Sequence, residues 1–291
     1  MSIAFRSPLP PPDGWASHQQ DVKRCRGTVC YGALAAHFGT DSPKILEWRV
    51  DRRQPYGGDG DPSTSNKYRR WRQGKALPHD DTVTNVAARS GGSVRLDFWR
   101  NLPLWGLLTP DPPPLQRLHA VLEKSPLPVR RVLFPIKYAF AMDGHPPAER
   151  FHHSMLDREQ TLGIRNLRSL GAFIALLCLA RKAEALDDDP HHFLPSLCAY
   201  DVFPRVLYSY RPLRYRWEGL FGCLERIFWS RIYATGYSPE FPIATVQESL
   251  RALDADPTAE LPRLSGKRLR VLENDPLGRA IDRMARAISV T

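Results

Sequence analysis

Residues 65–78 read Ser65-Asn66-Lys67-Tyr68-Arg69-Arg70-Trp71-Arg72-Gln73-Gly74-Lys75-Ala76-Leu77-Pro78. This run holds five cations, two aromatic residues and no acidic residue. A helix would place Tyr68 and Trp71, which are three residues apart, on the same side, where they form an apolar edge. Positive charge at this density is costly to hold together unless solvent or a polyanion compensates it. The run therefore predicts a short helix that docks on its own domain through two rings and turns its cations toward a polyanion.

The composition of the whole chain agrees with a polyanionic partner. The 291 residues include 41 Lys and Arg against 31 Asp and Glu, which gives a net charge of +10. Such a balance favours nucleic acid or an anionic membrane face, and residues 65–78 are where the positive charge is densest. A chain of this length also exceeds the usual size of one domain, so two domains are expected.

The cysteines and the apolar segments indicate the cellular compartment of the protein and whether it spans a membrane. Five cysteines are spread over the chain, and the first residues carry no apolar export segment. The longest apolar stretch, Leu170 to Ala180, is shorter than the roughly 20 residues that a membrane helix needs. We expect a cytoplasmic protein that needs no disulfide and has no membrane partner.

Helical periods, rather than the alternation typical of strands, run through the chain, so an all-α fold is expected. Residues 1–20 contain four prolines and no period, which indicates a flexible arm. The run Thr109-Pro110-Asp111-Pro112-Pro113-Pro114 cannot be helical and is expected to separate two helical domains. The predicted domains are a smaller one over residues 21–108 and a larger one over residues 115–291.

Individual helices follow from the apolar spacing. In the smaller domain, two short helices are expected between Thr28 and Val50, separated by the turn Gly39 to Ser42. A further helix is expected after Pro78, with Asp80 and Asp81 in its first turn and Gly91-Gly92 at its end. In the larger domain, the expected helices are Leu115–Lys124, Glu149–Leu186, Leu194–Leu207, Trp217–Tyr233, Ile243–Leu253 and Pro276–Ile288.

A set of spacings in and after the basic run matches a known motif. The set has an apolar residue, an aromatic residue three further on, Gly-Lys-x-x-Pro, and an alanine nine residues after the proline. It is filled here by Tyr68, Trp71, Gly74, Lys75, Pro78 and Ala87. Over residues 66–90 the chain therefore resembles the recognition helix, turn and next helix of repressor-type (lambda repressor-like) helix-turn-helix proteins. The resemblance implies that the smaller domain is helix-turn-helix-like and binds duplex DNA.

The chain departs from that family in two places. The family usually has glutamate two residues before the glycine, where this chain has Arg72, so an intradomain anchor is replaced by a cation. The loop from Gln54 to Ser65 also separates the basic run from the preceding helices. Either this insertion lengthens the turn within one domain, which we favour, or Ile45 to Arg52 is the reading helix.

The resemblance assigns roles to the residues of the basic run. In helix-turn-helix docking, the start of the second helix reaches base edges while flanking cations meet phosphates. The residues expected at the major groove are Ser65, Asn66, Lys67, Arg69 and Arg70. Asn66 suits adenine, and Arg69 or Arg70 suits guanine. Arg72 and Lys75 are expected on the DNA backbone; the simpler alternative is a solvated basic face on a structural helix.

Two other regions offer alternatives. Tyr208 to Trp217 interleaves rings and guanidinium groups, as single-strand binders do, but aromatic residues at this density more often pack or form a dimer surface. Asp187-Asp188-Asp189-Pro190-His191-His192, with His152, His153 and Asp157, contains the side chains of a metal-dependent nuclease. The acidic run lies between two helices, where capping and solvation explain it.

The sequence thus predicts a non-enzymatic DNA-binding protein, a transcriptional regulator or recruiter, with no catalytic residue, cofactor or metal site. Its partners would be duplex DNA and a second copy or other subunits of a nucleoprotein complex, with the aromatic helices after Tyr208 as the dimer surface. The alternatives are a non-catalytic subunit that binds RNA or protein, and a metal-dependent nuclease.

Overall fold

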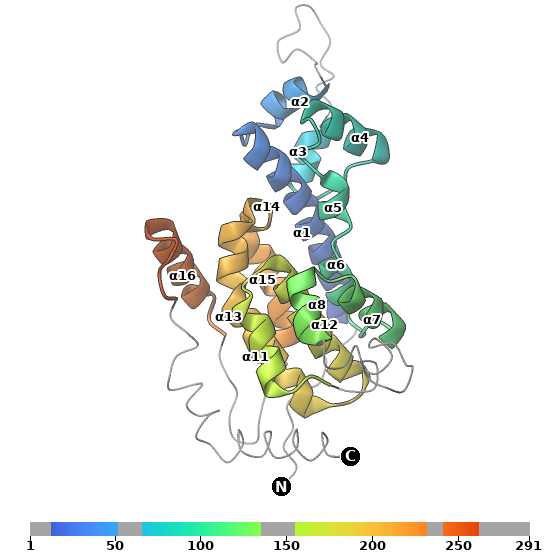
Figure 1. Ribbon diagram of the computed structural model, residues 1–291. Helices are drawn as coiled ribbons and strands as arrows, with labels where there is room; N and C mark the ends of the chain where they lie inside the picture. The colour runs from blue at the N-terminus through green and yellow to red at the C-terminus, as the bar shows by residue number, and fades with distance from the viewer. Residues whose placement is uncertain (1–12, 52–65, 135–154, 232–240, 262–291) are drawn as a thin grey trace, which may run out of the picture. The chain divides into compact units, whose positions relative to one another are not determined.

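The computed structural model describes residues 13–51, 66–134, 155–231 and 241–261, and every regular element in these ranges is helical (Figure 1). Because no strand occurs in the described ranges, the all-α prediction is confirmed. The chain divides into two compact units. The α1 unit comprises Pro10–Leu108 and Ser209–Leu224, and the α12 unit comprises Met1–Leu9, Thr109–Tyr208 and Glu225–Thr291.

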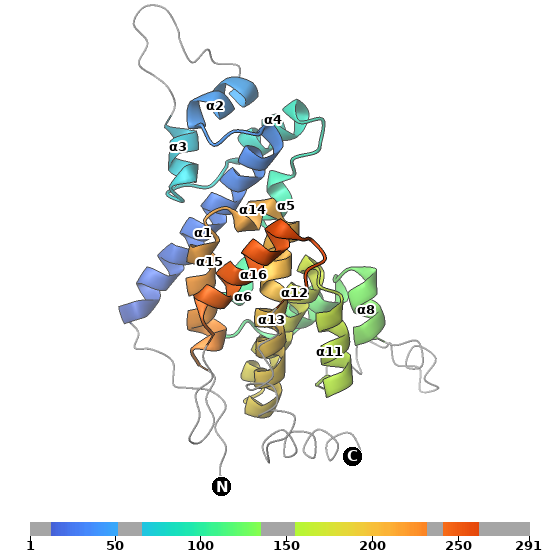
Figure 2. The same ribbon diagram turned by 90° about the vertical axis from the view of Figure 1, so that its left-hand side faces the viewer.

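The α1 unit is built around one long helix, α1 (Asp13–Phe38). Its other helices are α2 (Pro43–Asp51), α3 (Lys67–Arg72), α4 (Asp80–Arg89), α5 (Leu96–Arg100), α6 (Leu104–Leu107), α14 (Arg211–Arg214) and α15 (Trp217–Leu224). Helices α3, α5, α14 and α15 pack against α1, and Figure 2 shows the last two beside it. The core of this unit includes Leu34, Leu46 and Leu96, which are fully buried.

Helix α1 begins earlier than the sequence predicts. Residues 13–20, which the sequence pattern places in the arm, form its first turns, and the helix runs unbroken past Thr28. The four prolines all precede residue 13, so none of them interrupts its hydrogen bonds. His18 holds these turns in place, because its buried Nε2 lies 2.7 Å from the Leu108 carbonyl oxygen. Residues 1–12 of the predicted arm lie outside the described residues.

Helix α4 ends as expected. Asp80 and Asp81 occupy its first turn, and Gly91 and Gly92 follow its end with φ of 58° and 78°. The Gly92 N–H donates to the Ala87 carbonyl oxygen at 2.8 Å, so the glycines close the helix with left-handed backbone that other residues adopt at a cost.

The α12 unit contains a central apolar helix, α12 (Leu170–Ala185), in which nearly every residue is buried. Its other elements are α7 (Leu115–Glu123), α8 (Leu127–Leu133), α11 (Arg158–Asn166), α13 (Asp189–Ser209, whose last residue is counted with the α1 unit), the π-helix η1 (Glu225–Trp229) and α16 (Ile243–Ala255). Helices α7, α8 and α11 pack against α12. The helix predicted at Pro276–Ile288 lies outside the described residues.

The single helix predicted over Glu149–Leu186 is wrong, because α11 and α12 are separate. Arg168 has φ of 47°, and the Ser169 side chain accepts a hydrogen bond from the Ala172 N–H at 3.2 Å. The chain therefore leaves the helical conformation at Arg168, and Ser169 caps a new helix. The apolar spacing continues through the break, so the sequence pattern does not reveal that two helices are present.

The segment 209–224 belongs to a different unit from the residues that flank it in the sequence. Residues 209–224 fall inside the predicted domain 115–291, yet they pack with the α1 unit. Gly32 of α1 makes this close packing feasible, because a Cβ there would lie 2.6 Å from the Tyr215 Cβ. The first part of the α1 unit ends at Leu108, before the proline-rich run, while the predicted extents of the two domains stay a prediction.

Candidate nucleic-acid interface

Helix α3 is seated in the α1 unit by its two aromatic side chains. Tyr68 is 0% exposed and Trp71 is 2% exposed, and their ring centroids lie 5.0 Å apart in an edge-to-face arrangement. They belong to the same core cluster as Leu46 and Val50 of α2. The expectation that this helix docks through its two rings is confirmed.

Ion pairs tie both ends of α3 to the region of α2. The Lys67 Nζ lies 2.8 Å from an Asp51 carboxylate oxygen, and the Arg72 Nη2 lies 2.6 Å from an Asp41 carboxylate oxygen. Asp51 is the last residue of α2, and Asp41 lies in the turn before it. Arg72 therefore serves as an intradomain anchor itself, which corrects the expectation that a cation at this position removes the anchor.

Among the residues that the structure describes, the remaining predicted site residues are not anchored by ion pairs as Lys67 and Arg72 are. Asn66, Arg69, Arg70 and Lys75 are exposed. Within the described residues, none of the three cations among them forms an ion pair. Asn66 is the N-terminal cap of α3, although its side chain makes no capping hydrogen bond, and Ser65 lies outside the described residues. The basic run thus divides into two anchored cations and three available ones.

The turn after α3 fixes the helix against α1. Gly74 has φ of 68°, and a Cβ at this residue would lie 2.4 Å from the backbone oxygen of Arg24. Gly27 of α1 faces the same turn, since a Cβ there would lie 3.1 Å from the Gly74 Cα. Two glycines in contact let the turn approach α1 closely, so the position of α3 depends on both.

A hydrogen-bonded centre at Asp41 joins three parts of the unit. One Asp41 carboxylate oxygen accepts the Arg72 ion pair, and the other accepts a hydrogen bond from the Tyr215 hydroxyl at 2.8 Å. The Tyr31 hydroxyl donates to the Asp41 backbone oxygen at 2.9 Å, and the rings of Tyr31 and Tyr215 lie 5.4 Å apart. Burial, followed by the charge of Asp41, raises the pKa of Tyr31, and burial, followed by the hydrogen bond to Asp41, raises the pKa of Tyr215, so both hydroxyls stay protonated donors.

Sequence reasoning missed this centre. Asp41 is a single acidic residue in a polar turn, and Tyr215 is 174 residues away along the chain. The only signal is the aromatic and basic run that contains Tyr215, which the sequence pattern places in the C-terminal domain.

Positive charge is concentrated in the α1 unit. Its described residues contain 16 Lys and Arg against 9 Asp and Glu, a net charge of +7. The described residues of the α12 unit contain 13 against 14, a net charge of −1. Within the described residues, the unit that carries α3 therefore has the stronger attraction for a polyanion.

Four large aromatic side chains that follow Tyr208 are buried. Trp217 and Phe221 are buried in the α1 unit, and Phe228 and Trp229 are buried in the α12 unit. These four side chains complete the cores of the chain itself, so they are not part of an exposed surface, and dimerisation through these helices stays a prediction.

Three residues of the nuclease alternative, Asp157, Asp188 and His191, make structural contacts. The Asp188 carboxylate lies 2.7 Å from His191 Nδ1 and accepts the His191 backbone N–H, while Asp157 forms a capping box with Gln160. No group of three or more metal-ligating side chains occurs in the part of the chain that is described. His152 and His153 lie outside that part.

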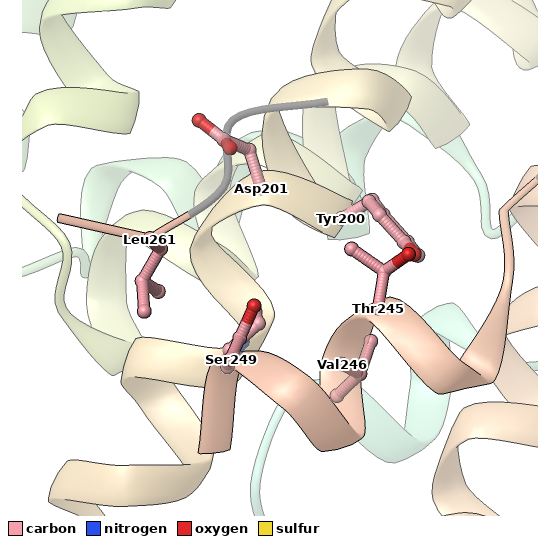
Figure 3. Close-up of a pocket in the computed structure, with 7 residues that line it drawn as sticks. Tyr200, Asp201, Thr245, Val246, Ser249 and Leu261 are labelled. Atoms are coloured by element: carbon pink, nitrogen blue, oxygen red, sulfur yellow. The ribbon is translucent and has the colours of Figure 1, made fainter. Parts of the chain in front are cut away.

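A small hollow lies between α13 and α16 in the α12 unit. It is lined by Tyr200, Asp201, Pro204, Thr245, Val246, Ser249 and Leu261 (Figure 3). The space suits roughly one water molecule, so this hollow does not accommodate an organic cofactor.

Comparison with protein-family models, with curated proteins and with solved structures finds no match to this chain. Among the described helices, none has the length and apolar character required to cross a bilayer.

Proposed function

We propose that this protein binds duplex DNA through the exposed cations of α3 and acts as a transcriptional regulator or recruiter without chemistry of its own. The observation that carries the proposal is the division within α3. Tyr68 and Trp71 are buried, Lys67 and Arg72 are anchored, and the side chains of Arg69 and Arg70 are left to solvent without an acidic partner in the described residues.

Helix α3 is preorganised for binding. A helix held at both ends by ion pairs and below by two rings presents its outer cations on a fixed support, so little freedom is lost when they meet phosphate or base edges. The net charge of +7 on the described residues of this unit adds long-range attraction. Among the predicted site residues, Asn66, Arg69, Arg70 and Lys75 are proposed as direct contacts, while Lys67 and Arg72 act mainly by positioning α3.

The proposal is tested with the double variant Arg69→Ala/Arg70→Ala. Selection from a random duplex pool first supplies a binding sequence, and affinity is then measured across salt concentrations. The slope of log K against log salt is expected to fall by about 0.9 for each phosphate that the variant no longer neutralises. If one arginine instead pairs with guanine, the variant also loses about 1–3 kcal/mol of discrimination at that base.

A matched control exists in the α12 unit. Arg130 and Arg131 are adjacent, exposed arginines on the short helix α8, so Arg130→Ala/Arg131→Ala removes the same charge from a unit whose described residues carry no net positive charge. We expect this variant to bind like the wild type, and Lys75→Ala to weaken all sequences alike. Unchanged DNA binding by the α3 double variant would refute the proposal. A wild-type protein without salt-dependent DNA binding would also refute it, and would favour a protein partner instead.

A further inference from the structure

Arg216 has a conformation that the backbone alone does not favour. It lies in the turn between α14 and α15, it is exposed, and its φ is 54°. Residues other than glycine adopt this left-handed region at a cost, and asparagine tolerates it better than arginine does. A turn selected only for its shape would favour glycine, so the long cationic side chain at this position calls for another explanation.

The position of Arg216 is set by the Asp41 centre. Its guanidinium carbon lies 5.8 Å from the centroid of the Tyr215 ring, and the Tyr215 hydroxyl donates to Asp41. Arg72 of α3 binds the other oxygen of the same carboxylate. Tyr215 therefore links Arg72, with which it shares Asp41, to Arg216, which lies over its ring, although the two arginines are far apart in the sequence.

The turn that carries Arg216 is packed closely against α1. Helix α14 packs on α1 at Gly32, where a Cβ would lie 2.6 Å from the Tyr215 Cβ and 2.9 Å from the Pro212 oxygen. The Tyr31 and Tyr215 rings are also in contact. A rotation of this turn would break these contacts, so Arg216 is held at a defined place next to α3.

The charge of Arg216 is not neutralised by an acidic side chain within the described residues. Asp41, the carboxylate of this centre, is already shared by Arg72 and Tyr215. An exposed guanidinium stacked near a ring, beside a helix that bears free cations, has the chemistry that recognises a phosphate group.

We propose that Arg216 contacts the phosphate backbone of the same duplex DNA that α3 binds, so that the Ser209–Leu224 segment supplies part of the binding surface. This inference rests on the proposed function. It adds a residue from a distant part of the sequence to that surface, and it gives the packing of this segment on α1 a role in binding.

The test uses Arg216→Gly in the full chain. Glycine removes the charge and suits the left-handed backbone, so the variant is expected to keep a cooperative thermal transition. The slope of log K against log salt should fall by about 0.9, and affinity at 0.1 M salt should fall roughly five- to tenfold. Arg216→Lys should restore most of the slope, because it returns the charge.

Arg168→Gly is the matched control. Arg168 is also an exposed arginine with positive φ, 47°, but it belongs to the α12 unit, so its replacement should leave DNA affinity unchanged. If Arg216→Gly fails to fold, the same salt slope is measured on Arg216→Asn, because asparagine tolerates the left-handed backbone and also removes the charge.

The outcomes separate the two proposals. A wild-type slope for Arg216→Gly, together with a reduced slope for Arg69→Ala/Arg70→Ala, would overturn this inference and leave the proposed function standing. A wild-type protein without salt-dependent DNA binding would overturn both.

Discussion

Single residues in the α12 unit place charge where water does not reach. The Glu184 carboxylate lies 2.5 Å from the Arg181 Nη1 and 2.8 Å from the Arg231 Nη2, and all three side chains are buried. Arg181 also donates to the backbone oxygen of Thr109 at 2.9 Å. Buried charges of this kind depend on complete pairing, because an uncompensated charge in the interior costs several kcal/mol.

Lys182, the next residue of α12, yields a prediction about pH. It is 0% exposed, and burial lowers its pKa to about 8 from an ordinary value near 10.5. Between these values the unfolded chain holds the proton and the folded protein has lost it, so this residue's contribution to the free energy of unfolding rises with pH. The expected rise between pH 7 and pH 10 is on the order of 2–3 kcal/mol.

The contribution of Lys182 has to be measured as a difference. Buried thiols act in the opposite direction, since burial raises the pKa of both Cys30 and Cys198 to about 12 and their folded forms keep protons that the unfolded chain loses. Urea unfolding of the wild type and of Lys182→Met across this pH range removes the shared terms. A difference that does not change with pH would contradict the prediction.

At the scale of elements, contact between the α3–α4 turn and α1 decides where the basic helix lies. Gly74→Ala would combine a left-handed residue with a Cβ placed 2.4 Å from the Arg24 backbone oxygen. The expected loss is about 2–4 kcal/mol of unfolding free energy, from backbone strain and overpacking together. Thermal or urea denaturation measures it.

Gly91→Ala provides the comparison for that substitution. Gly91 has a similar φ, 58°, but a Cβ there would meet nothing within 4 Å, so only the conformational cost of about 1–2 kcal/mol applies. Equal losses at the two glycines would show that the close approach to α1 contributes nothing.

Local patterns predict elements better than they predict partners. The periodicity and turn signals identify α2, α4, α7 and α16 because each has its own apolar face and its own boundary residues. They also predict the burial of Tyr68 and Trp71. They do not predict that Arg72 meets Asp41 or that Tyr215 joins them, since an ion pair between distant residues leaves no periodic trace.

For the whole molecule, the central fact is that the α1 unit is discontinuous in sequence. Helix α1 packs against α14 and α15, which follow about a hundred residues after Leu108. The Cys25 Sγ of α1 lies 4.0 Å from the Cys223 Sγ of α15, both buried, so the core of this unit is closed by side chains from both parts.

A truncation tests this dependence. A fragment of residues 10–108 should lack a cooperative thermal transition and should bind a hydrophobic dye, because the surface of α1 that α14 and α15 cover becomes exposed. The same fragment joined through a long flexible linker to residues 209–224 should regain the transition. A fragment of residues 10–108 that melts cooperatively at the temperature of the full chain would contradict the expectation.

The split arrangement also has a consequence during synthesis. A ribosome adds about 5–20 residues per second. The synthesis of Leu108 is therefore separated by on the order of ten seconds from the synthesis of α15, the last helix of the α1 unit. During that interval the apolar side of α1 is open to chaperones or to another nascent chain. Rare codons placed between these two segments would therefore be expected to lower the yield of native protein more than the same codons placed after residue 224.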